Sequence, residues 1–331
     1  MNMTPYSDYW RQALPTYMGH WPGNLLGHIP TALIALDKRE ARDLLELNMV
    51  LIDSKHHELA HEAEALATAS IPRQVSDKQI HDALSQYCQD RMQRLVGETA
   101  GHVHSLVNRM ADAIQDLGGK IFVRLDSRSP KDSWQGHQEG FACTTAARAL
   151  QLLTDSERVY EDLSAAKAQN RSVWIALRKW VDIHKEAEFR VIYNGATKAM
   201  CVSQYHYRED WKQDSPELNP VLNPIFVMQA IRNLWREVGD QILESAADGS
   251  VVFDVYVKRE FDLQEFSIVN TPNGRGVDVG PSGRMWLTAH LIEINPFMEM
   301  TDPCLFNWEK DMFDKDEFRY KKDGLVVGGV L

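Results

Sequence analysis

The sequence has little cysteine, no long apolar run and no excess of positive charge, and each of these absences argues against a class of function. Its four cysteines, Cys88, Cys143, Cys201 and Cys304, are far apart and form no CxxC pair. This spacing argues against a zinc knuckle or a disulfide framework and is typical of a reducing compartment. We therefore expect buried thiols, because free cysteine is among the most buried residue types.

No apolar run reaches the roughly 18–20 residues that a membrane-spanning helix needs. Residues 1–15 also lack the apolar stretch of a signal peptide. These features predict a cytoplasmic protein without a membrane partner. The formal net charge is -11, and such a surface repels a phosphate backbone, so nucleic acid is not favoured as a partner. Net charge does not exclude a local basic groove.

The overall composition is that of a folded protein. Hydrophobic residues make up 44% and charged residues 25% of the 331 residues, which is an ordinary globular balance. Disorder needs a lower apolar fraction, so most of the chain is expected to fold. The length allows two domains of ordinary size.

The first third of the sequence, residues 1–117, reads as mainly helical. Residues 30–70 have few helix breakers, and Ser76 begins a capping-box pattern that predicts a second helix. Gly118 and Gly119 supply a C-terminal stop, because glycine tolerates the left-handed conformation there. We place the first domain boundary at this glycine pair.

From residue 120 the pattern changes to strands with short connections. The Asn194-Gly195 pair predicts a hairpin with a type I′ turn, which needs two positive φ angles. The expected strands are Ile121–Leu125, Val173–Trp180, Phe189–Tyr193, Thr197–Gln204, Val251–Val257 and Trp286–Asn295, and the expected helices are Thr154–Asn170 and about Pro224–Ala247.

The last two expected strands carry three oxygen-bearing side chains. Alternate residues of a strand share a face, so Glu293 and Asn295 lie on one side with Leu291, roughly 6.5–7 Å apart at the backbone. In the preceding strand, Asp254 lies on the face opposite a wholly apolar one. If the two strands pair, the three polar side chains converge on one point.

A carboxylate in an apolar strand is costly to bury without a partner. Mg²⁺ suits this role, because it takes oxygen ligands and leaves room for substrate phosphates. The alternative is that Asp254 and Glu293 face solvent or pair with arginine and lysine. The cations Arg124, Lys131 and Arg190 could contact phosphates, and ordinary surface charge is the alternative for each.

Five short segments carry a family resemblance in their order along the chain. They are Phe122–Asp132, Leu177–Trp180 with Ala187–Arg190, Val202–Gln204, Phe253–Tyr256, and Leu291–Phe297 through Asp302. Together they resemble the cell division cycle protein 123 family. The resemblance implies an α+β fold of the ATP-grasp type, with two lobes that hold ATP·Mg between them. The expected division is a helical region 1–117, a smaller lobe 118–180, a larger lobe with the metal site 181–318, and a C-terminal tail 319–331.

The resemblance also implies roles for individual residues. Asp254, Glu293 and Asn295 match the metal-binding positions, and Arg190 matches a phosphate-side arginine. Arg124 stands where the family typically has a phosphate-contacting lysine, and Glu293 where it usually has an aspartate. The remaining cofactor-binding residues implied are Lys131 and Asp132 in a phosphate-covering loop, and Arg178, Lys179 and Trp180 on a hinge strand beside the adenine.

Three functions follow as hypotheses. The first is an ATP·Mg-binding assembly factor or chaperone for a protein partner, since eukaryotic members of the family assist the assembly of translation initiation factor 2 through its gamma subunit. The alternative is an ATP-grasp ligase or a nucleotidyl or phosphoryl transferase acting on an unidentified acceptor, so enzymatic activity stays open. The third is a degenerate, structural ATP-grasp domain, which the arginine at Arg124 favours.

Three further patterns suggest sites but have ordinary explanations. The HExxH string at residues 57–61 is flanked by charges, which disfavours a zinc protease. The glycine-rich stretch 273–283 is typical of a hairpin connection rather than a phosphate cradle. An aromatic cluster either stacks on a base or peptide or packs within a lobe; its members are Tyr205, Tyr207 and Trp211.

Overall fold

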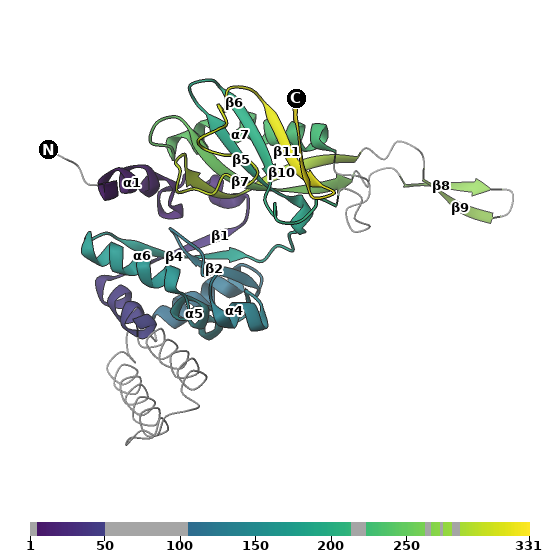
Figure 1. Cartoon of the computed structure of the whole chain (residues 1–331). Helices are drawn as coiled ribbons and strands as arrows, with labels where there is room; N and C mark the ends of the chain where they lie inside the picture. Colours follow the sequence, from purple (N-terminus) through teal and green to yellow (C-terminus); the bar gives the residue numbers. More distant parts are fainter. Residues whose placement is uncertain (1–4, 50–104, 213–222, 262–265, 272–273, 280–284) are drawn as a thin grey trace, which may run out of the picture. The chain divides into compact units, whose positions relative to one another are not determined.

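The computed structural model describes residues 5–49, 105–212, 223–261, 266–271, 274–279 and 285–331 (Figure 1). The chain divides into two compact units. Unit 1 comprises Met1–Ile29 with Val181–Leu331, and unit 2 comprises Pro30–Trp180. Each unit combines helices with its own sheet, so the expected α+β class is confirmed.

Unit 2 contains a four-stranded antiparallel sheet in the order β1-β4-β2-β3. Its strands are β1 Thr31–Leu36, β2 Ile121–Leu125, β3 Ala142–Cys143 and β4 Val173–Lys179. Its helices are α4 Trp134–Glu139, α5 Ala146–Thr154 and α6 Glu157–Ala168, together with the helical segments 38–49 and 105–116.

The hydrophobic core of unit 2 lies on one face of this sheet. Alternate strand residues point into it, namely Ile121, Val123, Leu125, Val173, Ile175 and Leu177. Helical side chains complete it, among them Leu44, Met110, Leu152 and Leu163. The intervening strand residues, which include Arg124 and Arg178, therefore lie on the opposite face.

The expectation of continuous helix over residues 30–70 is wrong for Thr31–Leu36. These residues pair with β4 along their whole length, so tertiary pairing overrides the helix propensity of alanine and leucine. The helix begins after Asp37, whose carboxylate accepts hydrogen bonds from the backbone N–H of Arg39 and Glu40, both at 2.8 Å. The Glu40 side chain accepts in return from the Asp37 N–H at 3.0 Å, which completes a capping box.

The expected helix stop at Gly118 and Gly119 is confirmed. Both glycines have positive φ angles, 92° and 82°, and the Gly119 N–H donates to the Ile114 carbonyl at 2.8 Å. The helix before them contributes Met110 and Ile114 to the same core as β1. The expected boundary at 117/118 therefore falls inside a compact unit. The helix predicted from Ser76 and the HExxH string lie outside the described residues.

Unit 1 contains a six-stranded sheet in the order β10-β7-β5-β6-β11-β12. Its strands are β5 Glu188–Asn194, β6 Ala199–Gln204, β7 Val251–Phe261, β10 Met285–Pro296, β11 Glu317–Lys322 and β12 Leu325–Val330. β8 Phe266–Thr271 and β9 Gly274–Val279 form a separate hairpin. The glycine-rich stretch was expected to connect two strands, but its residues 274–279 form the strand β9 itself. Residues 319–331, expected as a tail, largely form β11 and β12.

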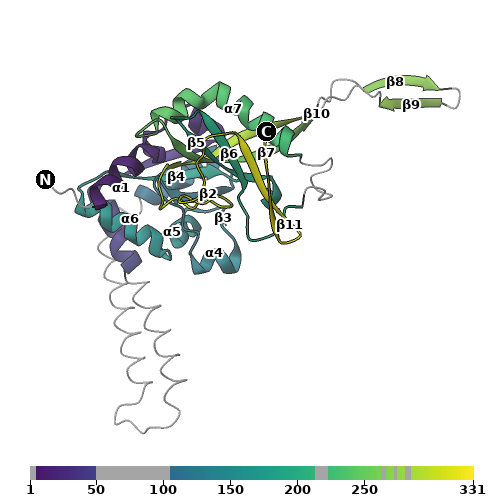
Figure 2. The same ribbon diagram turned by 45° about the horizontal axis from the view of Figure 1, so that its top comes forward.

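Helix α7, Pro224–Glu244, lies along one face of the six-stranded sheet, as Figure 1 and Figure 2 both show. Asn223 caps its start by accepting from the Ile225 N–H at 2.8 Å. The Trp235 ring stacks on Phe253 with the ring centroids 5.6 Å apart. The apolar alternation of β7 thus predicts the buried face correctly. The remaining helices of unit 1 are short: α1 Pro5–Ala13, η1 Leu14–Thr16, η2 Met18–His20, η3 Leu25–Gly27 and η4 Lys185–Ala187.

The opposite face of this sheet is covered in part by the segment between β10 and β11. Phe306 and Phe313 of this segment join Ile192, Cys201 and Val252 in a second apolar cluster. Next to this cluster, the same face carries a row of polar side chains from β5, β7 and β10. No helix among the described residues combines the length and apolar character that a membrane span requires.

The hairpin predicted at Asn194-Gly195 is confirmed, but its two-residue turn is wrong. β5 and β6 close with Asn194 opposite Ala199, so the loop has four residues. Lys198 carries the positive φ, of 62°. Gly195 serves a close approach instead, because a Cβ there would lie 2.1 Å from the Gly249 carbonyl oxygen.

Candidate functional site

A polar row crosses three neighbouring strands of the six-stranded sheet. Asp254 of β7 lies opposite Glu293 of β10 on one side and opposite Arg190 of β5 on the other. Directly paired residues of adjacent strands point to the same face, so the three side chains share one surface. The expected pairing of the two carboxylate-bearing strands is therefore confirmed.

A β-bulge sets the direction of Glu293. The register of β10 against β7 shifts between Leu291 and Glu293, so that Ile292 is an extra residue. Leu291 pairs with Val255 on the buried face and is fully covered. The expectation that Leu291 shares a face with Glu293 is wrong, because the bulge breaks the simple alternation. Bulges re-aim side chains in this way next to functional sites.

Arg190 and Asp254 form a buried, two-pronged ion pair. Nε of Arg190 donates to Oδ1 of Asp254 at 2.7 Å, and Nη2 donates to Oδ2 at 2.8 Å. The third nitrogen, Nη1, donates to the Asp302 carbonyl at 2.6 Å. Asp254 is 1% exposed and Arg190 is 7% exposed. Pairing with arginine therefore accounts for the burial of Asp254.

The row carries more negative than positive charge. Burial raises the pKa of Asp254, Arg190 counteracts that rise, and the neighbouring carboxylates Glu293 and Glu188 raise the pKa further. Burial alone would lower the pKa of Arg190, but Asp254 more than reverses this, so the guanidinium stays charged. Glu293 and Glu188 thus lie near the buried Asp254, and Glu188 also contacts Nε2 of His206 at 3.0 Å.

Asn295 completes the set of oxygen-bearing side chains expected from the sequence. It lies opposite Val252, next to the polar row, and its Nδ2 donates to Oδ2 of Asp254 at 3.4 Å. The structure therefore brings Asp254, Glu293 and Asn295 together. Among the described residues, His, Cys, Asp and Glu form no group of three that could hold a metal ion.

Two members of the expected aromatic cluster, Tyr205 and Tyr207, lie beside this row. The Tyr205 ring lies under Arg190, with its centroid 5.0 Å from the guanidinium carbon, and the Tyr207 hydroxyl donates to Asp302 at 3.0 Å. Glu188 shares the face of Arg190, which strand alternation alone would have indicated. Trp211 instead packs edge-on to Phe189, 5.6 Å between centroids, so ordinary packing explains it.

The expectation of buried thiols is confirmed for Cys143 and Cys201 but not for Cys304. Cys143 and Cys201 are buried and Cys304 is partly exposed. Burial raises the pKa of Cys143 to about 11 and that of both Cys201 and Cys304 to about 12. A thiol with so high a pKa is almost wholly protonated near neutral pH and is a poor nucleophile.

The expected phosphate-contacting residue of unit 2 is committed to its own backbone. Arg124 is 3% exposed; its Nε donates to the Leu125 carbonyl at 3.0 Å and its Nη2 to the Ser127 carbonyl at 2.7 Å. Arg178, 4% exposed, shares its sheet face and donates to Oγ1 of Thr31 at 3.4 Å. Two cations thus lie on the face opposite the core.

The expected phosphate-covering loop is tied to the helices around it. Asp132 accepts hydrogen bonds from the Ser156 hydroxyl at 2.5 Å and from the Arg158 N–H at 3.1 Å, both at the start of α6. In return, Ser133 donates to Asp155 at 2.9 Å. Asp132 therefore acts as a helix cap, while its neighbour Lys131 is exposed.

The expected hinge residues lie at the end of β4. Lys179 is exposed, and its N–H donates to the Pro30 carbonyl at 2.8 Å. The Trp180 N–H donates to the Lys120 carbonyl at 2.9 Å, and Nζ of Lys120 lies 5.0 Å from the Trp180 ring centroid. A cation–π contact therefore occupies one face of this indole.

A family model that covers most of the chain shows which family it belongs to. The model of the D123 family matches residues 27–323, which is most of the chain, and the chain therefore belongs to that family. The resemblance stated from the sequence is confirmed.

Two relatives show how far the similarity extends. The "Translation initiation factor eIF2 assembly protein" of Xenopus laevis is 26% identical over 211 residues, covering 61% of this chain and 52% of the relative. "Cell division cycle protein 123" of Eremothecium gossypii is 26% identical over 211 residues, covering 61% and 49%. The chain thus spans about half the length of these relatives.

A solved structure shares the fold. The structure of Cdc123 from Schizosaccharomyces pombe aligns with a TM-score of 0.51 at 20% sequence identity, covering 93% of this chain and 92% of that one. At this identity the match concerns the fold alone.

Proposed function

We propose that this chain is an ATP·Mg-binding assembly factor of the ATP-grasp type that acts on a protein partner. The observation that carries the proposal is the polar row of Glu293, Asp254 and Arg190, with Asn295 beside it. Two carboxylates and an amide supply oxygen ligands of the kind that Mg²⁺ takes in proteins. A guanidinium next to them suits a phosphate group.

The charges of the row fit a divalent cation. Asp254 is buried beside Glu293 and Glu188, and both carboxylates raise its pKa. The guanidinium of Arg190 pairs with Asp254 itself. Asp254, Glu293 and Asn295 would hold Mg²⁺, which would supply charge neutralisation for nucleotide phosphates. Arg190 would keep Asp254 ionised and fixed in direction.

The partner is proposed from the names of the relatives. The Xenopus and Lodderomyces proteins are both named translation initiation factor eIF2 assembly protein. We infer a protein partner of the same kind for this chain and a cytoplasmic location. Nucleotide binding would stabilise the conformation that holds the partner through its differential affinity for that conformation.

Thermal unfolding with and without ligands tests the nucleotide part of the proposal. A ligand at 100 times its dissociation constant stabilises the folded state by about 2.7 kcal/mol, so ATP with MgCl₂ should raise the melting temperature clearly. ATP alone and MgCl₂ alone should have much smaller effects. No shift with ATP and MgCl₂ together would contradict the proposal.

Retention of recombinant eIF2 subunits on the immobilised full chain tests the partner. Retention should increase when ATP and MgCl₂ are present, and retention that ignores nucleotide would contradict an ATP-dependent role. Analysis of the nucleotide products in the same samples distinguishes an assembly factor from an enzyme. Release of ADP, AMP, phosphate or pyrophosphate in step with an acceptor would indicate a ligase or transferase instead.

A further inference from the structure

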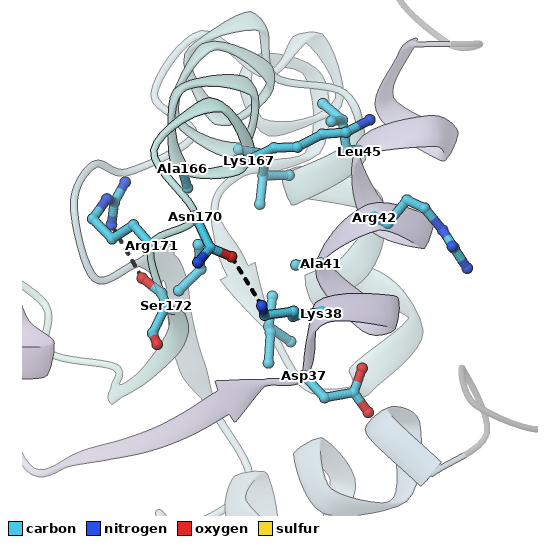
Figure 3. A pocket seen from close by; sticks show the side chains of 13 residues that line it. Asp37, Lys38, Ala41, Arg42, Leu45, Ala166, Lys167, Asn170, Arg171 and Ser172 are labelled. Atoms are coloured by element: carbon cyan, nitrogen blue, oxygen red, sulfur yellow. Dashed lines mark hydrogen bonds between the residues drawn. The ribbon is translucent and has the colours of Figure 1, made fainter.

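Unit 2 contains a pocket that is separate from every residue discussed so far as a nucleotide contact. It lies between the start of the helical segment 38–49 and the end of α6, next to the first residue of β4, Val173 (Figure 3). Its volume is about 220 Å³. All the residues that line it are described and belong to this one unit.

The floor of the pocket is apolar and belongs to the hydrophobic core. Five of its side chains are between 2% and 8% exposed, namely Leu36, Leu45, Leu163, Ala166 and Val173. Core side chains hold fixed positions because protein interiors are close-packed. The floor is therefore a fixed apolar surface, and its side chains do not move to fill the pocket.

The rim of the pocket is basic. Four cations line it, Lys38, Arg42, Lys167 and Arg171, although the chain as a whole has a net charge of -11. The one acidic residue of the lining is Asp37, whose carboxylate already accepts two backbone hydrogen bonds as a helix cap.

Two of the rim cations, Lys38 and Arg42, make weak contacts. Lys38 Nζ donates to the side chain of Asn170 at 2.9 Å, at the mouth shown in Figure 3. Arg42 lies 3.4 Å from Asp43 and 3.9 Å from Glu46, with its own side chain 50% exposed. Exposed ion pairs of this kind contribute little free energy, so a ligand's carboxylates can replace them.

The size of the pocket limits what it can hold. Pockets for whole small molecules are roughly 300–1,000 Å³, which is larger than this one. A dry apolar cavity of about 150 Å³ holds one benzene molecule, which is smaller. The volume therefore suits a single large apolar side chain, and the basic rim suits acidic groups on either side of it.

From these features we infer that the pocket docks an acidic peptide segment of a protein partner. One large apolar side chain of the segment enters the pocket, and flanking carboxylates pair with Lys38, Arg42, Lys167 and Arg171. The pocket requires an apolar group with acidic groups close to it on either side. A peptide meets this requirement, because its side chains at neighbouring positions can be apolar and acidic in turn. This site goes beyond the proposed nucleotide site and does not depend on it.

Selection from a displayed library of random nonapeptides on the full chain, without ATP, tests the inference. The expected result is a consensus with one leucine, isoleucine, phenylalanine or tryptophan flanked by aspartate or glutamate. Selected peptides, labelled with fluorescein, are then titrated by anisotropy at two salt concentrations. A consensus without acidic residues, or no enrichment over background, would overturn the inference.

Variants assign the binding to the pocket. The exposed pair Lys38→Glu and Lys167→Glu should weaken peptide binding at least about tenfold, since it replaces two attractions by two repulsions. Lys310→Glu in unit 1 is the matched control and should leave affinity unchanged. Equal affinity for the double variant and the control would overturn the inference.

A filling substitution tests the apolar half of the site. Ala41→Phe places a ring toward the floor and should abolish binding of the anchored peptide, while circular dichroism melts verify folding. Overpacking can destabilise Ala41→Phe, so a second experiment uses the wild-type chain. It measures the affinity of a peptide whose large apolar residue is replaced by alanine. Equal binding of that alanine peptide would overturn the inference. Displacement of the peptide by inorganic phosphate or by RNA at lower concentrations than by acidic peptide would also overturn it.

Discussion

The buried polar residues of the two units serve different ends. In unit 1, Arg190 and Asp254 satisfy one another across two strands, and Glu293 is added by a bulge to the same face. In unit 2, Asp132 caps a helix and Arg124 bonds to carbonyls of its own loop. The arrangement in unit 1 brings acidic side chains together, whereas the side chains in unit 2 form hydrogen bonds with nearby residues. Buried polar side chains therefore gather charge at one place in unit 1, whereas in unit 2 they satisfy backbone groups of nearby segments.

Replacing Arg190 should cause the largest loss of stability and so gives the strongest test of the difference between the two units. Replacing it in Arg190→Met leaves the buried Asp254 without its partner, which costs about 3–5 kcal/mol for a buried pair. Urea titrations followed by circular dichroism measure this loss. The double variant Arg190→Met with Asp254→Leu should recover most of it, because no uncompensated charge remains. Arg236→Met, at an exposed position of α7, is the matched control. Equal losses for the single and double variants would contradict the account.

The pH dependence of stability tests Asp126 in unit 2. Burial raises its pKa from 3.8 to about 6, so the folded state binds the proton more tightly than the unfolded state. Its contribution is therefore fully present below about pH 4 and is lost as pH rises through 6, by at most roughly 3 kcal/mol.

Urea titrations between pH 4 and pH 7 measure this contribution. Asp126→Asn cannot titrate, so the difference in stability between wild type and variant should change in the variant's favour as the pH rises. A difference that is constant over this range would show that Asp126 has an ordinary pKa.

The capping role of Asp132 predicts a moderate effect. Asp132→Ala removes the acceptor for the Ser156 hydroxyl and the Arg158 N–H, and loss of such a cap costs about 1–2 kcal/mol. The affinity of the folded variant for ATP should stay unchanged. Loss of ATP affinity at unchanged stability would instead support the phosphate-covering role that the family resemblance implies.

The smallest expected effect belongs to Arg124. In Arg124→Lys a single ammonium replaces a guanidinium that reaches two carbonyls, so about 1 kcal/mol of stability is lost with one hydrogen bond. Thermal melts measure the change. A gain in stability would show that the arginine is strained against its loop, and the family's lysine at this position would then be the better fit.

Much of the fold follows from local sequence patterns. The strand Ile121–Leu125 and the start of α7 at Pro224 match the expectations, because alternation and an Asn-Pro start are local signals. The β1 strand was missed because its pairing with β4 joins residues far apart in sequence. Its alanines and leucines carry no local sign of a strand.

The sequence predicted which residues come together in the polar row, but not the hydrogen bonds that they form. The expected convergence of Asp254, Glu293 and Asn295 on one face is found in the structure. The partner of Asp254 is Arg190, which is 64 positions away in the sequence, and only the strand order brings the two together. The bulge at Ile292 was invisible as well, because it exists only through the register between β10 and β7.

The central claim is that Glu293 and its neighbours bind Mg²⁺ with ATP. Calorimetry of ATP binding, with and without MgCl₂, on wild type, Glu293→Gln and the exposed control Glu299→Gln tests it most directly. Glu293 is preferable to Asp254, whose replacement would leave Arg190 buried and unpaired. The account predicts Mg²⁺-dependent binding by wild type and Glu299→Gln that Glu293→Gln loses. Equal, Mg²⁺-dependent binding by all three proteins would contradict it.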